Sequence, residues 1–157
     1  MKYYIGQVFE NDYPNEAVKW ANEHGAYILQ NGTKFTILEI PAPSLDEIKQ
    51  AKLASLKSMR DSLEVEPIFY NGHYFDYDEK ARDRINAAII SLDLLGEGTV
   101  ISWTTADNTE AIVSANDLRG VIGAVAIRSN ELHIKYRRLR ELVDKAKTVA
   151  EVETIVW

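Results

Sequence analysis

The feature that most constrains the fold is a long heptad pattern in the C-terminal part of the sequence. From Leu118 onward, apolar or small residues recur in alternating steps of four and three, which over about four heptads is typical of a helix that packs along another helix. That packing takes place either in the core of this chain or between two copies. The positions of the pattern are Leu118, Ile122, Val125, Ser129, Leu132, Tyr136, Leu139, Val143 and Ala146.

Two signals interrupt the helical pattern within residues 115–147. Gly120 and Gly123 each cost about 1 kcal/mol in a helix interior. Ser129, followed by Asn130, is suited to cap a second helix. The segment is therefore compatible with one continuous rod or with two helices, and we expect two helices packed on a domain core.

Two prolines mark the clearest boundary in the chain. Pro41 and Pro43 suit an extended connector and fit neither a helix interior nor a central strand. Ser44 and Glu47 then form a capping box that begins a helix, and residues 44–65 are predicted to be a linker helix. Its apolar stripe is thin, which is typical of a connector packed on one side, and consists of Leu45, Ile48, Leu56, Met59 and Leu63, with Lys52 interrupting it.

Residues 1–43 predict a small β-α-β-β domain. A β-rich strand over 3–9 is followed by a short helix that ends at Gly25. Asn31-Gly32 then connects two strands, because Asn-Gly favours the type I′ turn in which both central residues take positive φ.

Residues 66–157 predict a second domain, so that the whole chain belongs to the α+β class. Asn71-Gly72 repeats the hairpin signal, and a further hairpin is expected over 99–113. The segment 79–95 between them has a strong apolar face at helical spacing. We expect the two hairpins to pack against these amphipathic helices.

Three residues are expected to anchor this second domain. Trp103 alternates with Ile101 on its strand and Trp157 follows a short capped helix, so both suit a buried core, although aromatic side chains are also common in interfaces. Asp78 is a good N-cap for the helix that follows it. Together with Asp76 it also forms the best acidic pair in the sequence, which would suit glycoside hydrolysis.

The charge of the chain is unevenly distributed. The net charge is −6, but residues 128–147 hold seven basic and three acidic residues. This basic helical stretch is either a solvated face or a surface for an acidic partner or another copy. Arg137, Arg138 and Arg140 are the arginines expected to face such a partner, whereas the acidic remainder argues against nucleic acid.

The sequence holds no recognised catalytic or cofactor-binding motif. The absence of cysteine excludes disulfides, thiolate nucleophiles and thiolate metal sites. The three histidines lie in different elements, without the spacing that presents two ligands on one helical face. We therefore expect no enzymatic activity, no cofactor and no metal.

A set of motifs in the second domain resembles an uncharacterised domain of tailed-phage and prophage proteins. The motifs lie at 70–78, 84–88, 101–108, 116–118 and 146–157. In that family the domain looks like the C-terminal module of tail-fibre assembly proteins and other small tail proteins. Residues 13–17 and 26–28 also look like the short leading domain of phage tail proteins.

The resemblance implies a phage tail accessory protein, most simply a tail-fibre or tail-spike assembly chaperone that acts by protein binding. The alternatives are a small structural component of the mature tail and, from another class, a carboxylate-based glycan hydrolase. The implied partner is a tail-fibre or tail-spike protein, with self-association also open. The implied locations are the host cytoplasm during assembly and the virion tail, without a membrane or nucleic acid as partner.

Overall fold

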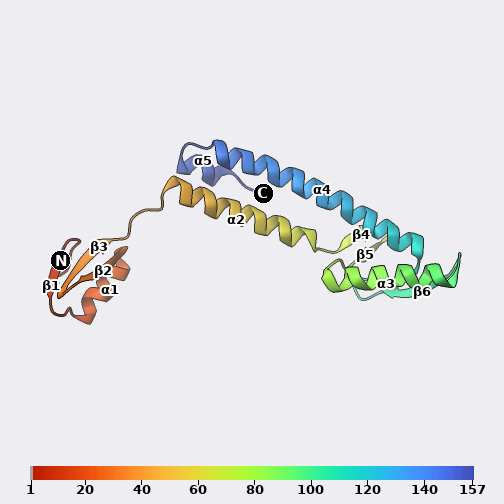
Figure 1. The fold of residues 1–157 in the computed structure, drawn as a ribbon, viewed down its shortest axis with the longest axis horizontal. Coiled ribbons are helices and arrows are strands. Elements are labelled where there is room, and N and C mark those ends of the chain that lie inside the picture. The colour runs from red at the N-terminus through yellow and green to blue at the C-terminus, as the bar shows by residue number, and fades with distance from the viewer. Residues whose placement is uncertain (1) are drawn as a thin grey trace. The chain divides into compact units, whose positions relative to one another are not determined.

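The structure, a computed structural model, describes residues 2–157 and divides the chain into two compact units, 1–44 and 45–157. Figure 1 shows helices and small antiparallel sheets in both. The expected α+β class is therefore confirmed. The boundary falls directly after the two prolines, and the helix expected as a linker belongs to the second unit.

The first unit is a three-stranded antiparallel sheet with one helix. The strand order is β1-β3-β2, and Ile37 on the central strand is fully buried. Ala17 and Ala21 on the helix pack into the same cluster, together with Tyr3 and Ala26. The elements are β1 (Val8–Glu10), α1 (Asn15–Glu23), β2 (Ala26–Asn31) and β3 (Lys34–Glu39).

The first strand is much shorter than the sequence predicted, because a turn occupies the residues expected to begin it. Gly6 takes a φ of +90°, a conformation that glycine adopts without steric cost, and the N–H of Gln7 donates to the carbonyl of Tyr4 at 3.2 Å. The regular ladder with β3 therefore begins at Val8, although Gly6 and Gln7 already form backbone hydrogen bonds with Ile37 on β3.

The two Asn-Gly turns differ. Asn71 and Gly72 both have positive φ, 47° and 87°, so the predicted type I′ geometry is present in the second unit. In the first unit Asn31 still pairs with Lys34, and the turn is shifted by one residue so that Gly32 takes the positive φ. Glycine at the first central position of a two-residue loop suits a type II′ turn instead.

The second unit contains two separate two-stranded sheets and the longest helices. Each sheet is an antiparallel hairpin, with β4 pairing β5 and β6 pairing β7. The elements are α2 (Leu45–Glu64), β4 (Ile68–Tyr70), β5 (His73–Phe75), α3 (Glu79–Leu95), β6 (Val100–Thr104), β7 (Glu110–Ser114), α4 (Ala115–Lys145) and α5 (Val149–Thr154).

The larger core of this unit lies where the two hairpins meet α3 and the first part of α4. Side chains from β5, α3, β6, β7 and α4 bury together there, because each hairpin turns one apolar face inward. The buried members are Phe75, Ile85, Leu92, Trp103, Ala111, Val113, Leu118 and Val121.

The segment expected to form two helices is one unbroken helix, α4, so that expectation is wrong. Ser129 does not cap a second helix; its hydroxyl donates across to the Glu64 carboxylate on α2 at 3.0 Å. α2 lies alongside α4 in Figure 1, and this packing supplies the stabilisation that the local glycine and cap signals lack.

A second core holds α2, α4 and α5 together. Leu56, Val143 and Ile155 are buried in it, one from each helix or from the segment directly after it. The Lys52 ammonium, which interrupts the apolar stripe in sequence, donates to the carbonyl of Ile155 at 3.0 Å. A second lysine contact, from Lys49 to the carbonyl of Asp144 at 3.0 Å, ties α2 to the end of α4.

The packed stripe of α2 differs from the predicted one: Leu53, which was not predicted, packs against the α2–α4–α5 cluster, and Met59, which was, does not. Met59 is 46% exposed. Its neighbour Arg60 turns inward instead, with the guanidinium 5.0 Å from the ring centroid of Tyr136, so a cation–π contact replaces the expected methionine packing. Among residues 2–157, no helix is long and apolar enough to cross a membrane.

Candidate functional site

An exposed aromatic pair lies on the outer face of the β4–β5 hairpin. Phe69 and Tyr74 are directly opposite each other, with ring centroids 5.0 Å apart, and their side chains remain 57% and 52% exposed. Because successive side chains of a strand alternate between faces, burying Phe75 and half-burying Ile68 on the inner face leaves this pair on the outer face.

The second hairpin extends this surface. The N–H of Ala106, in the β6–β7 loop, donates to the carbonyl of Tyr74 at 2.8 Å. A shallow depression of about 360 Å³ lies at the junction, lined by Glu66, Pro67, Tyr74, Ala106 and Asp107. We name Pro67, Phe69, Tyr74 and Ala106 the aromatic surface.

The acidic edge of the aromatic surface is held rigidly. The Asp107 carboxylate accepts hydrogen bonds from the hydroxyls of Thr105 at 2.6 Å and Thr109 at 2.8 Å. These bonds, that from Thr105 first, hold the pKa of Asp107 below its ordinary value of 3.8. With Glu66 nearby, the surface offers aromatic rings beside negative charge, which suits an apolar partner segment that carries a basic residue.

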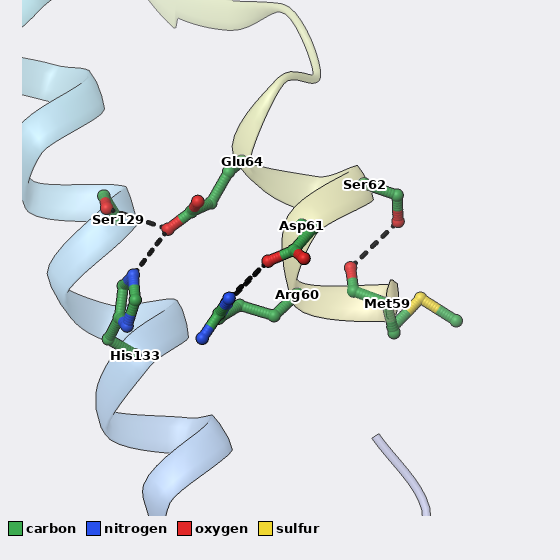
Figure 2. A network of polar contacts seen from close by, with 7 residues as sticks. All are labelled: Met59, Arg60, Asp61, Ser62, Glu64, Ser129 and His133. Atoms are coloured by element: carbon green, nitrogen blue, oxygen red, sulfur yellow. Dashed lines mark hydrogen bonds and ion pairs between the residues drawn. The ribbon is translucent and has the colours of Figure 1, made fainter. Parts of the chain in front are cut away.

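A polar network joins α2 and α4 (Figure 2). The Glu64 carboxylate lies between the two helices and accepts from the hydroxyl of Ser129 at 3.0 Å, and its Oε1 is 2.9 Å from Nε2 of His133. The Arg60 guanidinium donates to the carboxylate of the adjacent Asp61. Glu64 and Ser129 also line a depression of about 570 Å³. Because their carboxylate and hydroxyl groups are bonded to each other across the two helices, we assign the network a structural role.

Arg128, on α4, hydrogen-bonds to carbonyls at and just after the C-terminal end of α2. Its guanidinium donates to the carbonyls of Glu64 at 2.8 Å, Glu66 at 2.8 Å and Pro67 at 3.2 Å. The last carbonyls of a helix lack intrahelical partners, and the guanidinium satisfies that of Glu64, the last residue of α2, together with two carbonyls of the segment after it. Sequence reasoning counted Arg128 only as part of a basic stretch, because the contact joins residues more than 60 positions apart.

The apolar residues predicted as interface candidates pack within this chain. Leu118 is buried in the cluster beside the hairpins, Val125 is buried on α4, and Val143 is buried against α2. The remaining four are half-buried on the same faces, and they are Ile122, Leu132, Tyr136 and Leu139.

The three candidate arginines lie on the solvent side of α4. Arg137 and Arg138 are exposed. Arg140 is also exposed, with its Nε 3.8 Å from the Asp144 carboxylate in the next turn. Such an exposed pair contributes little to stability, so these side chains remain accessible to a partner.

The two expected tryptophan anchors lie in different cores, and Asp78 serves as a helix cap. Trp103 is 8% exposed within the larger cluster, with the Arg84 guanidinium 4.9 Å from its ring centroid. Trp157 is half-buried against the α2–α4–α5 cluster, with the Lys135 ammonium 4.9 Å from its ring. The Asp78 carboxylate accepts from the N–H of Ala81 at 2.7 Å, as an N-cap does.

The acidic pair considered for glycan hydrolysis has no site geometry around it. Asp78 is engaged in its cap and Asp76 is exposed, and neither residue lines one of the depressions described for this chain. Within residues 2–157, no group of three or more histidine, aspartate and glutamate side chains is placed to hold a metal ion.

Sequence reasoning missed the aromatic surface, although a usable signal was present. In a hairpin with Asn71-Gly72 as its turn, Phe69 and Tyr74 fall opposite each other on the face away from Phe75. The junction with the Ala106 loop has no such signal, because the contact joins two hairpins separated by a helix.

Comparison with known proteins identifies one family. Neither the curated proteins nor the solved structures include a match to this chain. A family model described as a domain of unknown function, DUF4376, matches residues 47–156. That range is most of the chain and coincides with nearly all of the second structural unit. The chain therefore belongs to the DUF4376 family.

Proposed function

We propose that this protein is a phage tail accessory protein that binds a tail-fibre or tail-spike protein and assists its assembly. The observation that carries the binding role is the exposed pair of Phe69 and Tyr74 on a rigid hairpin. Aromatic side chains on a preformed surface are typical of the residues that dominate protein interfaces.

The proposed role in a phage tail rests on the resemblance described above. The position of the aromatic surface supports that role. Two of the segments that carry the resemblance, 70–78 and 101–108, meet through the hydrogen bond from Ala106 to Tyr74. A binding role in the tail would therefore place the partner on residues that the resemblance itself includes.

The acidic residues at the edge of the aromatic surface indicate which side chains a partner should carry. Glu66 and Asp107 line the depression beside Tyr74, so a fibre segment with an apolar side chain flanked by lysine or arginine is the expected ligand. Burial of the rings supplies affinity, and the charge pairs set orientation and the rate of association.

Co-expression with a phage tail-fibre protein tests the proposal. A tagged copy is expected to retain the fibre protein on a column and to increase the soluble trimeric fraction of the fibre. The double variant Phe69→Ser with Tyr74→Ser is expected to lose retention. Ile127→Ser is the matched control, because Ile127 is 65% exposed on α4 and lies outside the aromatic surface.

Two results would contradict the proposal. A fibre protein that trimerises fully alone and never retains this chain removes the chaperone role. Equal retention by the double variant and the control removes the aromatic surface as the binding site. Mass spectrometry of purified virions then separates a helper that leaves from a structural component that stays in the tail.

A further inference from the structure

Strand β2 leaves one edge of the sheet in the first unit open. The strand order β1-β3-β2 places it at the end of the sheet, and within residues 2–157 no further strand pairs with it. The N–H of Ile40 donates to the carbonyl of Gly25 at 2.8 Å. Because bonded pairs alternate along an antiparallel ladder, Tyr27 and Leu29 also direct their backbone groups to β3. The residues between them direct their N–H and C=O groups to the open edge, and these outward residues are Ala26, Ile28 and Gln30.

This edge lacks the features that normally protect an edge strand. Charged side chains, proline, bulges and very short strands are the usual protection. β2 is six residues long and contains neither proline nor glycine, and residues 24–33 include no aspartate, glutamate, lysine or arginine. The opposite edge is protected, because β1 is three residues long and carries Glu10. An open row of backbone donors and acceptors is complementary to another extended strand, so a strand is the expected occupant of the β2 edge.

The backbone of β2 is complementary to a second copy of itself. If two copies pair antiparallel about Ile28, Ile28 faces Ile28 of the second copy and Ala26 faces Gln30 of the second copy. All three residues direct their backbone groups outward, so every outward N–H and C=O of the strand meets a partner. Because residues 24–33 hold no acidic residue, lysine or arginine, this register places no like charges opposite each other.

The side chains on the outer face of the sheet favour the same register. Tyr27 and Leu29 are 41% and 47% exposed there, whereas Ala26 is buried on the other face with α1. In the antiparallel pair Tyr27 faces Leu29 of the second copy at a position without backbone bonds, where side chains approach most closely. A two-fold axis through Ile28 repeats this contact and occupies the open edge of both copies, so the assembly stops at two.

We propose that β2 is a homodimerisation edge, at which two copies of this chain pair antiparallel about Ile28 and join their sheets into one. The edge belongs to the first unit and lies outside residues 47–156, which the family model matches. It is distinct from the aromatic surface and does not depend on the proposed function. A dimer of this kind carries two aromatic surfaces.

Light scattering during size exclusion of the full chain, over a series of concentrations, tests the proposal. The chain of 17.8 kDa is expected to elute with twice that mass. Leu29→Glu is expected to raise the dissociation constant about tenfold with unchanged circular dichroism, because it places a carboxylate beside the paired strands. Val8→Glu is the matched control. Val8 is 50% exposed on the same sheet face but lies on β1, so this variant is expected to remain dimeric.

Two further variants test the hydrogen bonds and the register. Gln30→Pro removes an outward N–H and leaves the donors to β3 in place, since proline is tolerated on an edge strand where its nitrogen faces outward, and it is expected to weaken the dimer. Tyr27→Lys is also expected to weaken it. The double variant Tyr27→Lys with Leu29→Glu is expected to restore the dimer, because each introduced lysine then faces an introduced glutamate of the second copy.

Four results would overturn the proposal or its geometry. A wild-type monomer at about 100 μM overturns the proposal, as does a dimer that Leu29→Glu leaves unweakened. Equal weakening by Val8→Glu and Leu29→Glu removes the β2 edge as the interface. If Gln30→Pro disrupts the sheet itself, the glutamate variant still decides the question. Weakening by Tyr27→Lys and by Leu29→Glu without rescue by the double variant overturns the antiparallel register.

Discussion

The ring of Tyr70 lies directly over Gly120, with no room between them for a side chain. An ideal Cβ placed at position 120 would overlap the ring and hydroxyl of Tyr70. Gly123, one turn later on the same helix, has no neighbouring atom within 4 Å of an ideal Cβ. The two glycines look equivalent in sequence, but the structure requires only the first.

This difference predicts opposite effects of alanine at the two positions. Gly120→Ala is expected to destabilise the protein by about 1 to 3 kcal/mol, because Tyr70 or the α4 backbone must move to avoid the clash. Gly123→Ala is expected to stabilise it by up to about 1 kcal/mol, because alanine favours the helix and meets open space. Urea unfolding monitored by circular dichroism measures both.

The double variant Tyr70→Ala with Gly120→Ala provides the control. Removing the ring makes room for the new methyl group, so Gly120→Ala should cost less in that background than in the wild type. An equal cost in both backgrounds would show that the helix itself, and not the contact with Tyr70, requires glycine.

The Arg128 guanidinium predicts a second large effect. Arg128→Ala removes its bonds to the carbonyls of Glu64, Glu66 and Pro67, and we expect a loss of about 2 to 3 kcal/mol because hydrogen bonds from a charged donor are the stronger kind. Arg128→Lys should recover only part of this, since a lysine ammonium cannot reproduce the planar fork.

Arg138→Ala is the comparison for that measurement. Arg138 is exposed on the same helix, and substitutions at such positions usually change the free energy of unfolding by less than about 0.5 kcal/mol. If both arginine-to-alanine variants unfold at the same urea concentration, the hydrogen bonds of Arg128 at the end of α2 do not stabilise the protein.

The turns and caps of this fold follow from the local sequence. The contacts between distant elements do not. The Asn71-Gly72 turn and the Ser114 cap lie where the residues place them, because turn and cap preferences act over a few positions. The continuity of α4 was predicted wrongly because the Ser129 hydroxyl can either cap a helix locally or bond to Glu64. Only the packing of α2 against α4 selects the bond to Glu64.

The candidate site shows the same division. Pairing of Phe69 with Tyr74 follows from the hairpin register alone. The extension of the aromatic surface to Ala106 depends on how the two hairpins pack against their shared core. Likewise, Lys52 interrupts an apolar stripe in sequence, yet its ammonium donates to a carbonyl 103 positions away.

Val143 predicts how far the smaller core supports the C-terminal segment. It is fully buried with Leu56 and Ile155, so Val143→Ala should cost about 2 kcal/mol through lost burial and a small cavity. Hydrogen exchange should rise most in α5, which depends on this cluster for its packing. Val149 is 37% exposed on α5 itself, so Val149→Ala should change the free energy of unfolding and the hydrogen exchange of α5 less than Val143→Ala does. Equal effects of the two variants would contradict the role of Val143 in supporting α5.

The capping box at the start of α4 predicts acid sensitivity. The Asp117 carboxylate accepts from the Ser114 hydroxyl at 2.6 Å and the Ser114 N–H at 2.9 Å. These bonds, the hydroxyl first, hold the pKa of Asp117 below its ordinary value of 3.8. The unfolded chain therefore binds this proton more readily, so the stabilisation is present above that value and is lost as the pH falls through the lower folded pKa.

Asp117→Asn should consequently reduce the free energy of unfolding at pH 7, and the difference from the wild type should shrink as the pH falls below the ordinary value of 3.8. Urea unfolding at a series of pH values measures this difference. Ser114→Ala removes the hydroxyl that contributes most to the lowered pKa, so Asp117→Asn should depend less on pH in that background. The same pH dependence with and without the hydroxyl would show that the bond from Ser114 is not its cause.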